Sequence, residues 1–223
     1  MKPPAPSSLA DLQARVRALS GRSLGEVAAS IGLRAPKDLH RQKGWIGVLM
    51  EDVLGATATS RAAPDFPHLG VEMKTIPLRP DGRPKESTYV CTAPLDGSLA
   101  TSWPESWVCR KLSRVLWIPI LGDGPPSERR VGRGLFWSPD HEETALLQQD
   151  YEELAGMIAL GEYWDLTARH GKVLQLRPKG ADGAARVWGL GEEGQWVQER
   201  PRGFYLRASF TERILGKRLR AGR

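Results

Sequence analysis

Hydrophobic positions follow a helical period in the first part of the chain. Apolar residues recur every three or four positions over 9–19 and predict an amphipathic helix. Ser23, with Glu26 three residues later, has the spacing of a capping box and predicts a short second helix. Residues 45–54 are apolar on almost every side and predict a third helix that ends at Gly55. The N-terminal region is therefore expected to be helical.

Further along the chain, short segments rich in β-branched and aromatic residues replace the helical pattern. Glycine, proline or aspartate bounds each of them, as is usual for strands. The predicted strands are 71–76, 87–93, 114–121, 134–138, 172–177 and 203–210. A long helix is expected between Asp140 and Gly161, and a basic helix is expected at the end of the chain. This pattern predicts a mixed α/β fold with a central sheet.

The length of 223 residues predicts one domain, 1–223, which can divide into two lobes. Residues 1–7 contain three prolines and are expected to form a loose leader. Residues 180–196 contain five glycines and are expected to form a mobile loop.

Charge and composition narrow the class of protein. The 32 Lys and Arg outnumber the 26 Asp and Glu, and the net charge of +6 favours a polyanionic partner such as nucleic acid without identifying it. No apolar run approaches the ~20 residues of a membrane span, and the N-terminus lacks the apolar core of a signal peptide. The two cysteines and four histidines have no metal-site spacing. A soluble, cytoplasmic protein that does not contact membranes is expected.

The stretch DFPHLGVEMKTIP at 65–77 concentrates charge on and beside a predicted strand. Because side chains alternate along a strand, Glu72 and Lys74 share a face and lie about 6.5 Å apart. Asp65 lies upstream, and a loop with Pro67 and Gly70 can turn the chain back toward the strand. Two carboxylates and an ammonium group can therefore converge.

Metal-assisted phosphodiester hydrolysis uses such a set of groups. A hard cation such as Mg²⁺ takes one or two carboxylates together with phosphate oxygens and water, and a lysine stabilises developing charge. Glu51, an acid on the apolar helix 45–54, is a candidate further member. The ordinary alternative is that Asp65 begins a turn while Glu72 and Lys74 form a surface ion pair. Spacing alone favours this alternative, because short D…ExK patterns are frequent by chance.

Five segments spread over nearly the whole chain resemble, in the same order, the MutH family of DNA mismatch repair endonucleases. They are KGWIGVLMEDVLGA at 43–56, DFPHLGVEMKTIP at 65–77, RKLSRVLWIPI at 110–120, TARHGKVLQLRPK at 167–179 and PRGFYLR at 201–207. The resemblance implies a restriction-endonuclease-like fold, in which helices flank a central mixed sheet and two arms surround a DNA cleft. It also reverses the preference for the ordinary alternative.

The resemblance further implies a function and a set of partners. The family nicks the unmethylated strand of double-stranded DNA at hemimethylated GATC sites, 5′ to the G, and the MutS and MutL proteins switch it on. The implied cofactor is Mg²⁺, with Mn²⁺ as a possible substitute. Asp65 and Glu72 match the family's metal-binding acids, Glu51 matches its helix acid, and Lys74 matches its catalytic lysine.

The family's DNA-reading positions fall on Arg177, Lys179 and Tyr205. Arginine and lysine suit the O6 and N7 acceptors of guanine, and by resemblance the tyrosine lies where the adenine N6 group is tested for a methyl. Considered alone, these residues favour the ordinary interpretation of a solvated strand end and an amphipathic ring at a sheet edge, and the matching family context favours the functional one. Three further positions match family residues near the phosphate backbone or the base step: Lys43, Tyr89 and Lys111.

Two other functions stay open at this point. A GATC restriction endonuclease would use the same fold and site, although one active site in a monomer suits a nicking enzyme better than a symmetric double-strand cutter. A non-catalytic DNA-binding protein would use the basic charge alone, and the intact Asp65, Glu72 and Lys74 argue against it.

Overall fold

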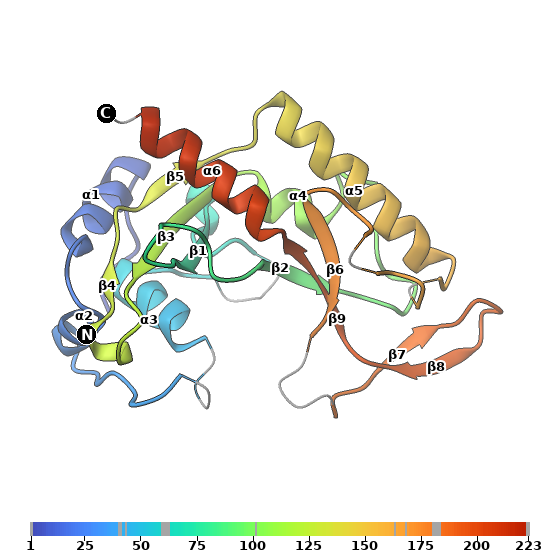
Figure 1. Ribbon diagram of the computed structural model, residues 1–223, viewed down its shortest axis with the longest axis horizontal. Coiled ribbons are helices and arrows are strands. Elements are labelled where there is room, and N and C mark those ends of the chain that lie inside the picture. The colour runs from blue at the N-terminus through green and yellow to red at the C-terminus, as the bar shows by residue number, and fades with distance from the viewer. Residues whose placement is uncertain are drawn as a thin grey trace. The chain divides into compact units, whose positions relative to one another are not determined.

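The computed structural model describes residues 2–39, 42, 44–58, 63–100, 102–162, 164–167, 169–179 and 184–221 (Figure 1). Packing divides the chain into two compact units. The first comprises Met1–Glu86, Arg114–Ser138 and Arg220–Arg223, and the second comprises Ser87–Ser113 and Pro139–Leu219. Among the described residues, no helix combines the length and apolar character needed to cross a membrane.

Three helices of the first unit form where the hydrophobic pattern predicts them. They are α1 (Leu9–Leu19), α2 (Leu24–Ser30) and α3 (Trp45–Leu54). The capping box before α2 is complete, because Ser23 Oγ accepts the Glu26 amide proton and the Glu26 carboxylate accepts the Ser23 amide proton. Gly55 ends α3 with a φ of 78°, a left-handed conformation that favours glycine.

The start of the chain is held against the first unit. Arg15 donates a hydrogen bond to the Pro4 carbonyl at 2.6 Å, and a ring nitrogen of His68 lies 2.7 Å from the Pro6 carbonyl. Pro6 itself is buried. These contacts differ from the loose leader expected for 1–7, because prolines remove amide donors but leave their carbonyls free to accept hydrogen bonds.

The sheet of the first unit centres on β3 (Val115–Leu121). β1 (Glu72–Pro77) pairs with it in parallel, and β4 (Arg130–Val131) and β5 (Leu135–Trp137) pair with it antiparallel. One face of β3 joins the same hydrophobic core as the buried sides of α1, α2 and α3. The chain between β1 and α3 contains the short 3-10 helix η1 (Pro67–Leu69), and a second one, η2 (Pro126–Glu128), precedes β4.

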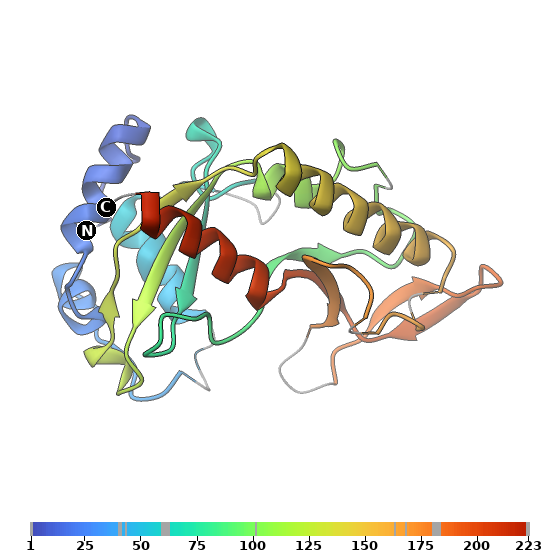
Figure 2. The same ribbon diagram turned by 45° about the horizontal axis from the view of Figure 1, so that its top comes forward.

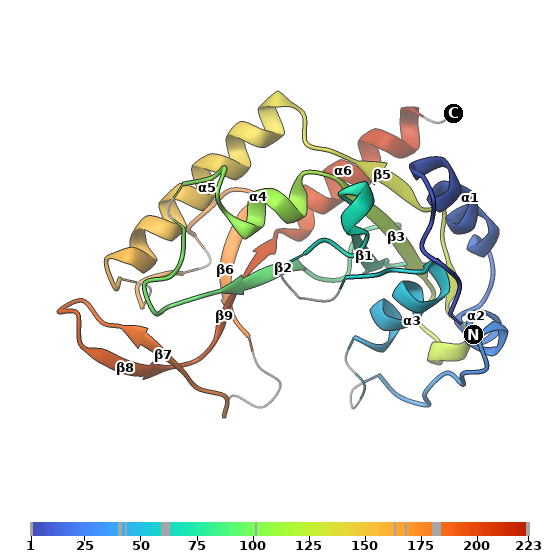
Figure 3. The same ribbon diagram turned by 180° about the vertical axis from the view of Figure 1, so that it is seen from behind.

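The second unit has its own antiparallel sheet in the order β2-β9-β6. Its strands are β2 (Thr88–Ala93), β9 (Arg202–Leu206) and β6 (Leu174–Pro178). α4 (Trp107–Leu112) lies beside β2, as Figure 3 shows, and the long α5 (His141–Ala159) packs on β6. The ring of Tyr151 on α5 contacts the ring of Phe204 on β9, with centroids 5.3 Å apart. The single central sheet expected from the pattern is thus distributed over separate sheets, because strand partners depend on long-range contacts that periodicity does not contain.

Two segments differ from the expected secondary structure. β7 (Val187–Leu190) and β8 (Trp196–Glu199) pair as an antiparallel hairpin that begins within the range 180–196, where a loop was expected (Figure 2). The glycine-rich turn between them includes Gly194 at a φ of 75°, so glycines marked a turn and not an irregular loop. The last predicted strand ends earlier, because α6 (Ala208–Ala221) begins two residues after β9.

A buried carboxylate fixes the start of β6 to α5. Asp150 is 1 % exposed, and its Oδ2 accepts the amide protons of Val173 at 2.6 Å and Leu174 at 2.8 Å. We expect Asp150→Ala to lower the free energy of unfolding by about 2–4 kcal/mol, because two buried amides lose their acceptor. Urea unfolding measures this, with the exposed Glu153→Ala on the same helix as a control that should change stability by less than about 0.5 kcal/mol. Equal effects of the two substitutions would contradict the assignment.

Candidate functional site

The loop before β1 fixes Asp65 beside the strand. Phe66 is fully buried and bridges to Val71 with two backbone hydrogen bonds, so the chain reverses through η1 and Gly70. The Asp65 carboxylate then accepts the amide proton of Met73 at 2.7 Å. The expected return of the chain toward the strand is confirmed.

Glu72 and Lys74 form a close ion pair on one face of β1. Lys74 Nζ lies 2.6 Å from Glu72 Oε1, as the alternation of side chains along a strand predicts. The side chain of Glu72 is 3 % exposed and that of Lys74 is 13 % exposed. The alternative of an ordinary surface pair is therefore wrong for these two residues. A buried pair costs desolvation energy, and retaining one is more typical of a functional site than of a stabilising device.

Electrostatics link Asp65 and Glu51 to this pair. Burial, and next the charge of Glu72, raise the pKa of Asp65 to about 6. Burial, and next the neighbouring Asp52, raise the pKa of Glu51, and Glu72 adds to this effect while Lys74 opposes it. The charges of the four predicted catalytic residues, Glu51, Asp65, Glu72 and Lys74, therefore influence one another. Three of these residues are acids and one is a base.

The donor chemistry fits a hard divalent cation. Carboxylate oxygens are the ligands that such ions prefer. Burial first, and neighbouring carboxylates second, raise the pKa values of Asp65 and Glu51, and a bound cation would favour the charged form of both acids. In the part of the chain that the structure describes, no three acidic, histidine or cysteine side chains are grouped closely enough to hold an ion by themselves. Ions of this kind usually take one or two carboxylates and complete their shell with phosphate oxygens and water.

Four predicted DNA-contacting residues meet on one face of the second unit's sheet. The rings of Tyr89 on β2 and Tyr205 on β9 pack edge to face with centroids 5.3 Å apart. The guanidinium group of Arg177 on β6 lies 5.7 Å from the Tyr205 ring centre. Lys179, directly after β6, donates a hydrogen bond to Tyr89 OH at 2.6 Å. Residues from all three strands therefore form one cationic and aromatic surface.

Comparison with known proteins identifies the family. A sequence model described as "DNA mismatch repair enzyme MutH" matches residues 54–150. The DNA mismatch repair protein MutH of Shewanella baltica (strain OS185) is 52 % identical over 214 residues, which cover 95 % of this chain and 96 % of the relative. MutH proteins of Shewanella sp. (strain MR-7) and Shewanella oneidensis are 51 % and 50 % identical over the same shares of both chains. The chain belongs to the MutH family.

Membership of the MutH family confirms the resemblance seen in the sequence, and the mixed α/β architecture agrees with the family's restriction-endonuclease-like fold. The family model spans Asp65, Glu72 and Lys74, and the similarity to the Shewanella proteins extends to the C-terminal positions that were predicted to read DNA. Divalent metal is the family's general cofactor, in agreement with the acids described above.

Two further residues, Lys43 and Lys111, were predicted to bind DNA. Lys43 lies outside the described residues. Lys111 lies on α4 and is 6 % exposed, so its ammonium group is largely removed from the surface at which a phosphate would bind. The phosphate contact of each stays a prediction.

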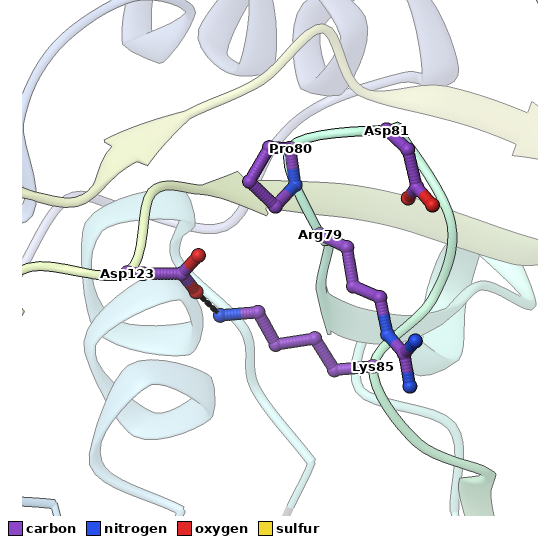
Figure 4. Close-up of a pocket in the computed structure, with 5 residues that line it drawn as sticks. All are labelled: Arg79, Pro80, Asp81, Lys85 and Asp123. Atoms are coloured by element: carbon purple, nitrogen blue, oxygen red, sulfur yellow. Dashed lines mark hydrogen bonds and ion pairs between the residues drawn. The ribbon is translucent and has the colours of Figure 1, made fainter.

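Some polar groups had no signal in the sequence. Thr92 lies 3.0 Å from Lys179 Nζ through its hydroxyl, although alternation along 87–93 places it on the opposite face from Tyr89. A pocket at the end of β1 is lined by Arg79, Pro80, Asp81, Lys85 and Asp123. Its Lys85 and Asp123 side chains form an ion pair (Figure 4). The two residues of this ion pair are 38 positions apart in the chain, so the sequence alone does not predict that they meet.

Proposed function

We propose that this chain is a methylation-sensing DNA endonuclease of mismatch repair. It nicks the unmethylated strand at hemimethylated GATC sites by Mg²⁺-dependent phosphodiester hydrolysis, and Mn²⁺ substitutes for Mg²⁺. The observation that carries this proposal is the Asp65 carboxylate fixed beside a buried Glu72–Lys74 pair in a chain of the MutH family.

Asp65 and Glu72 hold the ion in this proposal. A cation held there would supply Lewis-acid chemistry, in stabilising phosphate charge and in making water more acidic. The Met73 amide fixes the Asp65 carboxylate in place before the substrate arrives. Lys74 supplies a fixed positive charge for the developing phosphate charge or orients the attacking water, and its hydrogen bond to Glu72 restricts its motion. Glu51 adds negative charge to the same site.

Base recognition falls to the face shared by Arg177, Lys179, Tyr89 and Tyr205. Arg177 and Lys179 donate to guanine O6 and N7 in the major groove. Tyr205 tests the adenine N6 group, because a methyl there adds bulk and removes one donor proton. The Tyr205 ring is contacted by Tyr89 on one strand and by Arg177 on the other, which holds it in place. MutL and MutS are the proposed activating partners.

A nicking assay on three duplexes tests the proposal. The purified chain is incubated in Mg²⁺, with and without MutL and ATP, with a hemimethylated GATC duplex, a fully methylated one and a scrambled site. We expect nicks in the first duplex only. No nick in the hemimethylated duplex under either condition would leave a non-catalytic DNA-binding protein. Equal cleavage of the two GATC duplexes would overturn methyl sensing while retaining the nuclease.

A further inference from the structure

Thr92 shares a face with Tyr89 because β2 is irregular between them. Regular alternation places residues three apart on opposite faces of a strand. The register of β2 against β9 shifts between Tyr89 and Cys91, so Tyr89 lies opposite Tyr205 while Thr92 lies opposite Gly203. Because residues 203 and 205 share a face of β9, this bulge turns the Thr92 hydroxyl toward the DNA-reading residues.

Three polar groups, those of Lys179, Tyr89 and Thr92, are each within hydrogen-bonding distance of the other two. Lys179 Nζ donates to Tyr89 OH at 2.6 Å and to Thr92 Oγ1 at 3.0 Å, and the two hydroxyl oxygens are 2.9 Å apart. An ammonium group only donates, so both oxygens accept from Lys179 and one hydroxyl donates to the other. The third N–H of Lys179 has no acceptor among the residues that the structure describes.

Gly203 leaves the space in which this set forms. It occupies the middle strand between β2 and β6, opposite both Thr92 and Arg177. A Cβ atom at position 203 would lie 2.9 Å from Cε2 of the Tyr89 ring and 3.1 Å from the Cys91 carbonyl oxygen. The absence of a side chain therefore lets the Tyr89 ring lie over the middle strand, where its face also meets Lys179 Nζ at 4.3 Å from the ring centre.

We propose that Thr92 is a positioning residue for base recognition. Its hydroxyl, together with that of Tyr89, fixes the Lys179 ammonium group and leaves one N–H for a guanine acceptor. Lysine carries a large rotamer entropy, so fixing it before DNA binds reduces the entropy lost on recognition. This inference rests on the proposed function, because it takes guanine as the group that Lys179 reads.

Substitution of protein and base together tests this role. Thr92→Val removes the hydroxyl at nearly constant volume, Thr92→Ser retains it, and Lys179→Ala removes the lysine. Each protein is assayed under single-turnover conditions on hemimethylated GATC duplexes in which 7-deazaguanine, which lacks N7, replaces each guanine in turn. The guanine read by Lys179 is the one whose replacement has no effect in Lys179→Ala.

The penalty for 7-deazaguanine at that position is the readout. We expect about a 10- to 100-fold penalty in the wild type, as a specific base contact of this kind provides, and the same penalty within about twofold in Thr92→Ser. In Thr92→Val we expect it to fall to about threefold or less, since the lysine then keeps only Tyr89 OH as an acceptor and can turn about that single hydrogen bond. An unchanged penalty in Thr92→Val would overturn the proposal. An equal loss of rate in Thr92→Val on every duplex would also overturn it, because that result indicates a phosphate contact. A gain in rate in Thr92→Val would overturn it as well.

A measurement without DNA separates this inference from the proposed function. In ¹⁵N-lysine-labelled free protein, the hydrogen-bonded Lys179 ammonium group should give a proton signal protected from exchange in the wild type and in Thr92→Ser, and its protons should exchange faster in Thr92→Val, which keeps only the bond to Tyr89. If the wild type nicks no GATC duplex, the proposed function fails, and the NMR result alone decides whether Thr92 restrains Lys179. Protection that is the same in Thr92→Val as in the wild type would overturn this restraint.

Discussion

Replacement of Lys74 by alanine is expected to slow nicking of a hemimethylated GATC duplex by about 100- to 1,000-fold, with little change in affinity for the duplex. This is the typical effect of removing one group that stabilises transition-state charge. Lys74 lies among the acids of β1 and the preceding loop, whereas the predicted base-reading residues belong to the second unit's sheet. Single-turnover nicking and a duplex-binding titration separate the two effects. Nicking at near wild-type rate would contradict the role given to the lysine.

The buried ion pair calls for a second variant. Removing Lys74 takes the ammonium group from a Glu72 side chain that is 3 % exposed, and breaking a buried pair in this way typically destabilises a protein by about 3–5 kcal/mol. Lys74→Arg keeps the positive charge but changes its position and geometry. We expect Lys74→Arg to unfold at nearly the wild-type temperature and still to nick at least about 10-fold more slowly. If nicking is lost only in variants that are also unstable, the lysine has a structural role.

Asp65→Asn is expected to abolish nicking and yet to stabilise the metal-free protein at neutral pH. Burial, and next the charge of Glu72, raise the pKa of Asp65 from 3.8 to about 6 in the folded state. The folded protein therefore binds more protons than the unfolded chain, and its stability falls as pH rises from about 4 to about 6. Asparagine carries no charge to desolvate, and its side-chain oxygen can still accept the Met73 amide proton.

Measurements of the free energy of unfolding over a range of pH, with EDTA present to remove metal, test the direction of this pH dependence. The wild type and Asp65→Asn should be similar near pH 4 and differ by about 1–3 kcal/mol above pH 6, with the variant more stable. Asp96→Asn is a control of opposite sign, because hydrogen bonds from Ser98 lower the pKa of Asp96 and its charge is favoured in the folded state. Adding Mg²⁺ or Mn²⁺ should raise the unfolding temperature of the wild type but not of Asp65→Asn. A less stable Asp65→Asn protein at pH 7 would contradict the electrostatic account.

Local signals predicted much of this structure. The reciprocal bonds of Ser23 and Glu26 and the left-handed Gly55 depend on neighbouring residues alone, so the sequence was sufficient to place α2 and the end of α3. The shared face of Glu72 and Lys74 follows from the period of a strand. The burial of that pair does not follow from the strand period, because it depends on elements from distant parts of the chain that pack around β1.

The arrangement of the predicted DNA-reading face could not be obtained from the sequence, because it depends on the register between strands that are distant in the chain. Strand periodicity separates Tyr89 from Thr92, and only the pairing of β2 with β9 shows the irregularity that brings them together. The distribution of strands over separate sheets has the same origin, since the partner of β1 is β3 and the partner of β2 is β9. The resemblance to the MutH family predicted the site residues, and the structure added the contact of Thr92 with Lys179 and the close approach of the Tyr89 ring to Gly203.

The acids and the lysine of the β1 region are proposed to cut one chosen strand of a GATC site. A hemimethylated duplex with a different fluorophore on each strand measures this most directly, in Mg²⁺ with the proposed partner proteins and ATP. We expect one product, the unmethylated strand cut 5′ to the G, and we expect Lys74→Ala to form it about 100- to 1,000-fold more slowly. Cutting of both strands at similar rates would contradict strand choice and favour a restriction endonuclease, and equal cutting by Lys74→Ala would contradict the site itself.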